Sequence, residues 1–359
     1  MKIVYIAETS LTNKSAYTQH VVKMSDAFCQ LNHDLILYLP RVKTNFVFNQ
    51  LKNQYLLIAQ KEFEIKSLIG FKLTNIFYKL FFLIKIIKNV KIDKPDLILT
   101  RSFLASIILS IFKISHILEI HSEFQSLTKF LMINLKFIKS KYIKKKILIS
   151  ESLNKIFDFK QNELIVLHDG VDIKNFNIIE SNNEIKKVCY IGGFYKGRGI
   201  ELIIKLAKNF PDLKFELYGQ TNDKLKVNLD NLKVYDYVDY CDVPNILKDS
   251  DLLLMPYAQK VFVRSKSLNT ADYCSPLKMF DYLASGKIII SSKLNGICEV
   301  LKHNINSILV DEYKYELWEQ EINNILKKKY DITKLKKNAI KTANKFTWIK
   351  RASTIVNTK

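Results

Sequence analysis

The sequence predicts an α/β protein with two domains, each built on a parallel β-sheet. Short runs rich in Ile, Leu and Val alternate with helical stretches along most of the chain, which is the pattern of parallel α/β domains. The series pauses at a polar stretch near the middle and then begins again. A chain of 359 residues is also long for a single hydrophobic core, so two domains are expected.

The first series contains six expected strands joined by helical stretches. The strands are KIVYIA (2–7), LILYL (35–39), DLILT (96–100), ILEI (117–120), KILI (146–149) and LIVL (164–167). Between the first two strands, apolar residues recur at helical spacing and predict a helix: Tyr17, Val21, Met24, Phe28 and Leu31.

The second series follows the segment KNFNIIESNNEIKK (174–187), which has the composition of an interdomain linker. Five strands are expected in it: KVCYIG (187–192), KFELYG (214–219), LKVYD (232–236), DLLLMP (251–256) and KIIIS (287–291). A helix over GIELIIKLAKNF (199–210) is expected to stop at Pro211. Two such domains would form a ligand-binding cleft between the carboxyl ends of their sheets.

The composition is strongly basic, with 56 Lys and Arg against 35 Asp and Glu and a net charge of +21. This excess favours an anionic partner, which would be nucleic acid, a phosphorylated metabolite or a membrane surface. A general bias toward lysine is the alternative explanation. Because the sequence has no recognition motif and no alternation of aromatic and basic residues, we expect no nucleic-acid partner.

Two segments mix lysines with Leu, Ile and Phe: FKLTNIFYKLFFLIKIIKNVKIDK (71–94) and LKFIKSKYIKKKILIS (135–150). A helix of this kind either lies on an anionic membrane or packs on the core with a solvated lysine face. Scattered cysteines and a first strand in place of a signal peptide favour the cytoplasm. The most apolar run (103–118) is too short and too polar to span a bilayer. We therefore expect a cytoplasmic protein, peripheral at the inner face of a membrane.

The turn YIGGFYKGRGIELI (190–203) holds four of the nine glycines of the chain, together with Lys196 and Arg198. Glycines let backbone amides approach a phosphate, and the start of the following helix favours an anion. The spacing is neither that of a Rossmann fingerprint nor that of a Walker loop, so an ordinary strand-to-helix turn is the alternative.

A helix is expected over SPLKMFDYLASGK (275–287), with Ser275 as N-cap, Pro276 in the first turn and Gly286 at the end. Lys278 and Asp281 fall on its polar face, opposite Met279 and Phe280. A lysine in the first turn opposes the helix dipole, unless an anion binds there. The alternative is a surface ion pair between Lys278 and Asp281 at i,i+3 spacing.

Taken in order, these motifs resemble those of family-4 glycosyltransferases, which are retaining enzymes with the GT-B fold. In the second half, YIGGFYKGRGIELI, FELYG, DLLLMPY, SPLKMFDYLASGK and INSILV carry the resemblance. In the first half, MKIVYIAE, LILTRS, ILEIHSEF, ILISESL and LHDGVDIKNF carry it. The final FTWIKRA resembles the helix that returns to the first domain. The resemblance therefore implies two Rossmann-like domains facing across a cleft: an acceptor-binding domain (1–172 with 345–359) and a donor-binding domain (173–344).

The resemblance also implies roles for particular residues. Arg198 and Lys278 match residues that bind the donor diphosphate, and Asp281 matches a glutamate that binds ribose hydroxyls. His121 matches the histidine that faces the transferred sugar, which makes His121, Arg198 and Lys278 the expected catalytic residues. The other expected donor-binding residues are Gly192, Gly193, Lys196, Ser275, Pro276 and Leu277. The chain departs from the family at Tyr273, where a first glutamate is usual, and at Gly193, where an arginine is often found.

The activity implied is transfer of a sugar from a UDP- or GDP-sugar to a lipid-linked or surface-polysaccharide saccharide, as in bacterial lipopolysaccharide or capsule synthesis. No convincing Asp-x-Asp metal site is present, so Arg198, Lys278 and helix N-termini are expected to stabilise the leaving group without a metal or cofactor. A GT-B epimerase and a non-catalytic subunit are the alternatives, and the second is suggested by Tyr273 and Asp281.

Overall fold

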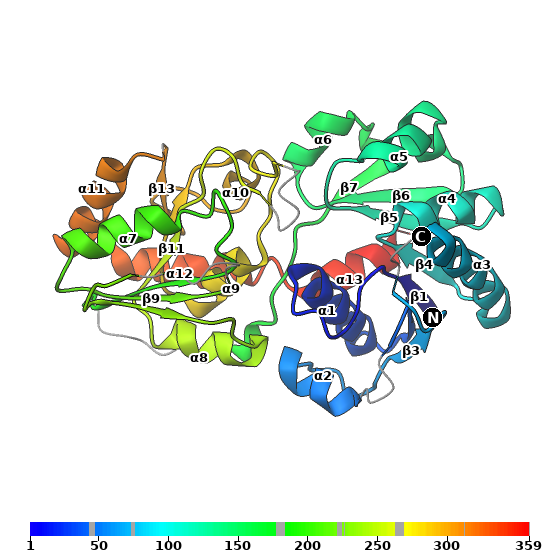
Figure 1. Ribbon diagram of the computed structural model, residues 1–359, viewed down its shortest axis with the longest axis horizontal. Coiled ribbons are helices and arrows are strands. Elements are labelled where there is room, and N and C mark those ends of the chain that lie inside the picture. Colours follow the sequence, from blue (N-terminus) through cyan, green and yellow to red (C-terminus); the bar gives the residue numbers. More distant parts are fainter. Residues whose placement is uncertain are drawn as a thin grey trace. The chain divides into compact units, whose positions relative to one another are not determined.

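The computed structural model divides into two compact units (Figure 1). It describes residues 1–42, 47–72, 76–176, 184–220, 225, 227–262, 269–311 and 313–358. The first unit comprises 1–149, 153–168 and 348–359, and the second comprises 150–152 and 169–347. Residues 177–183 of the expected linker, and 73–75 of the first basic segment, lie outside the described residues.

The first unit is built on a seven-stranded parallel sheet with the order β3-β2-β1-β4-β5-β6-β7. Its strands are β1 (Lys2–Ile6), β2 (Asp34–Leu39), β3 (Glu64–Ser67), β4 (Leu97–Thr100), β5 (His116–Ile120), β6 (Ile143–Leu148) and β7 (Leu164–Val166). All six predicted strands are present. The seventh, β3, was not predicted, because this edge strand reads EIKS and carries no apolar run.

Helices cover this sheet, and the last helix of the chain belongs to the same unit. They are α1 (Ala16–Gln30), α2 (Phe48–Tyr55), α3 (Ile76–Asp93), α4 (Phe103–Ile111), α5 (Ser126–Lys129), α6 (Glu151–Phe157) and α13 (Trp348–Asn357). The predicted helix after β1 is confirmed, and the Ser15 side chain caps it by accepting from the Thr18 amide. Helix α13 packs against α1, where the Trp348 and His20 rings lie 5.2 Å apart. The expected return of the C-terminal helix to the first domain is therefore confirmed.

The two basic segments have different structures. Residues 76–93 form α3, whereas residues 135–150 form a short 3₁₀ turn (Phe137–Lys139) and strand β6. The helical interpretation of the second segment was therefore wrong, because Ile143, Ile147 and Leu148 are buried as part of a strand. Among the described residues, no helix combines the length and the apolarity needed to cross a membrane.

The second unit is built on a six-stranded parallel sheet with the order β10-β9-β8-β11-β12-β13. Its strands are β8 (Lys187–Ile191), β9 (Lys214–Tyr218), β10 (Leu232–Tyr235), β11 (Leu252–Met255), β12 (Ile288–Ser292) and β13 (Ile308–Val310). Its helices are α7 (Ile200–Asn209), α8 (Val243–Lys248), α9 (Leu277–Ser285), α10 (Asn295–Cys298), α11 (Tyr315–Leu326) and α12 (Ile332–Ala343). The five predicted strands are present, and β13 lies in the INSILV stretch.

Each sheet has a point at which the order of its strands reverses. This point lies beside β1 and β4 in the first unit, and beside β8 and β11 in the second. Open parallel α/β sheets bind ligands outside the carboxyl ends of the strands at such a point. Binding residues are therefore expected in the loops that follow these strands in each unit.

Candidate active site

The glycine-rich loop between β8 and α7 packs against the backbone that follows β11. Gly197 and Gly199 have φ angles of +84° and +79°, which side-chain-bearing residues rarely adopt. A Cβ at Gly197 would lie 1.9 Å from the Lys260 carbonyl oxygen, and one at Gly199 would lie 2.0 Å from the Pro256 carbonyl oxygen. These two glycines are therefore required for close packing of the loop against this backbone. The sequence had indicated only a role in phosphate binding for the glycines of this loop.

Helix α9 begins one residue later than predicted. Pro276 occupies the N-cap position, and Leu277 is the first helical residue. The predicted end is confirmed, since Gly286 adopts the left-handed conformation with a φ of 65°. The alternative of a solvated polar face was wrong, because Asp281 and Tyr282 are buried together with the apolar face. Helix α9 packs against both α8 and α12, which leaves no side of its middle turns open to solvent.

The Lys278 ammonium is buried in this unit without a hydrogen-bond partner among the described residues. Its Nζ lies 3.6 Å from the centre of the Tyr190 ring and 5.3 Å from that of the Tyr257 ring. It also lies close to the backbone of the glycine loop, because a Cβ at Gly192 would come within 2.7 Å of Nζ. Cation–π contacts with these rings compensate the lost hydration only in part.

The surface ion pair considered for Lys278 and Asp281 is not formed. The Asp281 carboxylate lies inside the unit and accepts a 2.9 Å hydrogen bond from the Tyr240 hydroxyl. Pairing of opposite charges at i,i+3 spacing is expected on an exposed helix surface. It does not occur here, because other elements of the unit enclose both side chains and provide their contacts. The binding of ribose at Asp281 stays a prediction.

Arg198 lies next to Lys278 and contacts the same aromatic ring. Its guanidinium carbon is 4.7 Å from the centre of the Tyr257 ring. Burial, and then the positive charge of Arg198, hold the pKa of Lys278 well below its usual value. Burial raises the pKa of Tyr257 to about 12, so this ring stays neutral and supplies no negative charge. Two cations thus face one neutral ring, an arrangement that a bound anion such as a diphosphate would stabilise.

The other predicted donor residues have less specific surroundings. Lys196 is exposed, while Ser275 is buried and Pro276 and Leu277 are half-buried at the start of α9. Gly193 lies against the Tyr195 ring, because a Cβ at Gly193 would come within 2.5 Å of a carbon atom of that ring. Tyr273, in place of the usual first glutamate of the family, is buried.

His121 follows β5 in the first unit, where it belongs to a buried cluster around Glu119. The Nε2 atoms of His20 and His121 each lie 3.0 Å from Glu119 Oε1. Burial, followed by the positive charge of Arg101, lowers the pKa of His121 to about 3. The imidazole is therefore neutral at physiological pH.

His20, Glu119 and His121 form the one group among the described residues whose donor atoms could together hold a metal ion, since they lie within 4.8 Å of one another. The Arg351 guanidinium also contacts Glu119 Oε1 and donates to the Leu167 and His168 carbonyls. A metal ion bound at Glu119 Oε1 would therefore be repelled by the positive charge of Arg351. Catalysis without a metal remains a prediction.

Three residues with clear places in these sites were not singled out from the sequence: Tyr190, Tyr257 and Arg101. Tyr190 lies in β8, Arg101 follows β4 directly, and Tyr257 lies two residues after the end of β11. Their position at the carboxyl ends of strands beside the reversal point is the signal that could have found them.

Similarity over the whole chain places this fold in the class of GT-B glycosyltransferase structures. A glycosyltransferase from Rickettsia africae is 14% identical, with a TM-score of 0.74 over 99% of this chain and 97% of that one. Anabaena Alr3699/HepE in complex with UDP-glucose is 15% identical, with a TM-score of 0.70 over 100% of both chains. The predicted fold class is thereby confirmed.

Within this class, residues 171–346 match the model of the family described as glycosyl transferases group 1. A curated relative from Sulfurihydrogenibium is 29% identical over 189 residues, which are 48% of this chain and 50% of the relative. It is named as a UDP-N-acetylglucosamine–N-acetylmuramyl-(pentapeptide) pyrophosphoryl-undecaprenol N-acetylglucosamine transferase. The chain spans about half the length of the curated relatives it matches.

Proposed function

We infer that this protein transfers a sugar from a nucleotide-diphosphate sugar to a saccharide acceptor, with retention of configuration and without a metal ion. The observation that carries this proposal is the buried Lys278 ammonium, which has no hydrogen-bond partner among the described residues and lies beside Arg198. An unpaired buried charge is costly, and a diphosphate would supply both the missing charge and the acceptor atoms.

In the proposed reaction, the bond between the anomeric carbon and the diphosphate oxygen breaks. The acceptor hydroxyl oxygen then bonds to the same face of that carbon, and the departing phosphate takes the hydroxyl proton. No protein nucleophile is required. Negative charge grows on the diphosphate as the bond breaks, and Arg198 and Lys278 stabilise it, a kind of electrostatic contribution that is usually the largest in catalysis.

The remaining expected contacts complete the proposed donor site. Gly192 and Gly193 would approach the donor through their backbone, and the carboxylate of Asp281 would bind the ribose hydroxyls. The neutral imidazole of His121 would contact the transferred sugar. UDP is the favoured nucleotide, since one similar structure holds UDP-glucose and one relative is named for a UDP-sugar.

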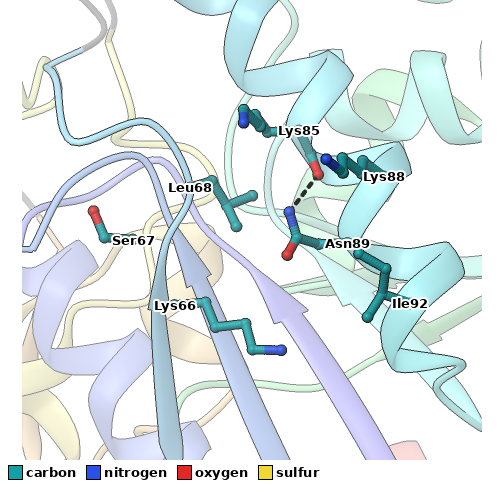
Figure 2. Close-up of a pocket in the computed structure, with 7 residues that line it drawn as sticks. All are labelled: Lys66, Ser67, Leu68, Lys85, Lys88, Asn89 and Ile92. Atoms are coloured by element: carbon teal, nitrogen blue, oxygen red, sulfur yellow. Dashed lines mark hydrogen bonds between the residues drawn. The ribbon is translucent and has the colours of Figure 1, made fainter.

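A lipid-linked acceptor at a membrane is supported by the surface of α3. Exposed apolar side chains recur at helical spacing along it: Phe77, Leu80, Phe81, Ile84 and Ile92. Beside them lies a cavity of about 340 Å³ to which β3 contributes Lys66 and α3 contributes Lys85 and Lys88 (Figure 2). Apolar side chains next to lysines match the acyl chains and anionic headgroups of a membrane surface. We propose that the protein works there in the assembly of a surface polysaccharide.

A nucleotide-sugar panel tests the proposed activity. Each donor is first scored by the rise in unfolding temperature, since a ligand that binds only the folded state stabilises it. The best donor is then incubated with membrane lipid extracts that contain lipid-linked saccharides, and nucleotide release and glycolipid products are measured. Acceptor-dependent release supports a transferase. Conversion of the donor without an acceptor would indicate an epimerase, and donor binding without turnover would indicate a non-catalytic subunit, which the hydrogen bond that occupies Asp281 favours.

A further inference from the structure

The first unit contains a cavity of about 410 Å³ at the carboxyl ends of β1, β4 and β5. Its lining includes Tyr17 from α1, Arg101 after β4, Phe103 from α4 and His121 after β5. The volume is in the range of small-molecule sites, and the cavity lies at the reversal point of the sheet. The chemistry of this lining indicates what it binds.

Arg101 is the main positively charged group of this cavity. Its guanidinium carbon lies 4.3 Å from the centre of the Tyr17 ring. That ring is fixed by its hydroxyl, which accepts a 3.0 Å hydrogen bond from the Glu8 amide. The Nη1 atom is buried, and no described residue accepts a hydrogen bond from it. Nor does Arg101 form an ion pair with any carboxylate in the described part of the chain.

The acidic groups nearby are already bound elsewhere. The Glu8 carboxylate accepts a hydrogen bond from the Ser102 hydroxyl, and Glu119 pairs with Arg351. Burial raises the pKa of Tyr17 to about 12, so its hydroxyl stays neutral. Lys79, which also lines the cavity, adds a second positive charge. The carboxylates of Glu8 and Glu119 also line the cavity, but neither forms an ion pair with Arg101, so the guanidinium keeps a free donor for a bound anion.

We propose that this cavity binds an acceptor saccharide that carries a carboxylate or a phosphate group, with Arg101 as the residue that binds the anion. The assignment to an acceptor rests on the proposed transferase function. A guanidinium presents a planar fork that matches both kinds of oxyanion. The Tyr17 and Phe103 rings supply apolar surfaces of the kind that pack against the faces of a sugar ring. Neutral saccharides would leave the guanidinium unpaired.

The test measures sugar binding by saturation-transfer difference NMR, with three probes: methyl β-D-glucuronide, glucose 6-phosphate and methyl β-D-glucoside. Wild-type protein is expected to bind at least one acidic probe about tenfold more tightly than the neutral one. Which of the two acidic probes binds more tightly distinguishes a carboxylate from a phosphate. Arg101→Gln is expected to remove the preference, and Arg101→Lys to retain part of it. Arg41→Gln is the matched control, because Arg41 is exposed outside the cavity and should leave the preference unchanged.

Equal binding of all three probes, no binding of any probe, or a preference that survives in Arg101→Gln would overturn the proposal. The unfolding temperature of each variant shows whether it is folded, and Arg101→Lys provides a second variant if Arg101→Gln is not. UDP and GDP titrations on the same samples report separately on the second unit. A wild-type protein that binds neither nucleotide, yet still prefers an acidic sugar through Arg101, would overturn the transferase function and leave the anion-binding cavity intact.

Discussion

Replacing Lys278 with methionine should make the ligand-free protein more stable and at the same time weaken its binding of nucleotide diphosphates. The ammonium is buried with no hydrogen-bond partner among the described residues, and Arg198 repels it. Methionine has a similar length and no charge, so it fills the same space between Tyr190 and the glycine loop without the cost of desolvating a charge.

The two effects have estimable magnitudes. Replacing buried charges by apolar groups is neutral or stabilising by about 1–4 kcal/mol, and the lost cation–π contact offsets part of this. A net gain of about 1 kcal/mol corresponds to a rise of roughly 2–4 °C in the unfolding temperature of a domain of this size. A hydrogen bond to a charged group is worth about 1.5–3 kcal/mol, so affinity for UDP or GDP should fall roughly 10–100-fold.

Differential scanning fluorimetry and isothermal titration calorimetry measure these two quantities. Lys208→Met is the matched control, because Lys208 is exposed on α7 and its replacement should change neither quantity. A Lys278→Met variant with a lower unfolding temperature and unchanged nucleotide affinity would contradict this prediction. The Lys278 ammonium would then stabilise the fold through its contacts with the aromatic rings and would have no role in ligand binding.

Three further predictions follow from single contacts. Between the lowered pKa of Lys278 in the free protein and its higher pKa beside a diphosphate, nucleotide binding should take up a proton at Lys278. Affinity should fall as pH increases through this range, and calorimetry in buffers of different ionisation enthalpy measures the uptake. Gly199→Ala should destabilise the protein by at least about 2 kcal/mol more than Gly70→Ala in denaturant unfolding, since both have positive φ but only the first also clashes with a carbonyl. Phe77→Ser should weaken binding to anionic liposomes about tenfold, whereas Ile305→Ser, at another exposed apolar position, in the second unit, should not.

Each of these has a contradicting result. Equal heats in all buffers would show that binding takes up no proton, and proton uptake that persists in Lys278→Met would show that another group titrates. Equal stability of the two glycine variants would mean that the loop moves away from the strand-end backbone at little cost. Liposome binding that is lost only in the Ile305 variant would assign membrane contact to the other unit.

The sequence predicted most strands of the fold, because buried parallel strands are short apolar runs that local composition reveals. It missed β3 because EIKS is an edge strand with little to bury. It placed α9 within one residue from Pro276 and Gly286, since caps act through neighbouring backbone. The burial of Asp281 and Tyr282 could not be foreseen, because it depends on α8 and α12 packing around the helix.

The candidate site shows the same division between local and tertiary information. The glycine turn and Lys278 stood out by composition and by position in a helix. Their partners did not, because Tyr190 and Tyr257 come from separate strands and meet Lys278 only in the folded sheet. The i,i+3 rule, which concerns an isolated helix surface, accordingly gave the wrong partner for Lys278. Arg101 was passed over although its place after β4 is as informative as that of His121 after β5.

Arg198 and Lys278 are proposed to bind the diphosphate of a nucleotide sugar. Calorimetric titration of UDP against UMP, and of GDP against GMP, tests this proposal most directly, since each pair differs only by the second phosphate. The diphosphate of one pair is expected to bind wild-type protein at least tenfold more tightly than its monophosphate, and Lys278→Met and Arg198→Gln are each expected to abolish most of this difference. Equal affinity for diphosphate and monophosphate in both pairs, or a difference that persists in both variants, would contradict it.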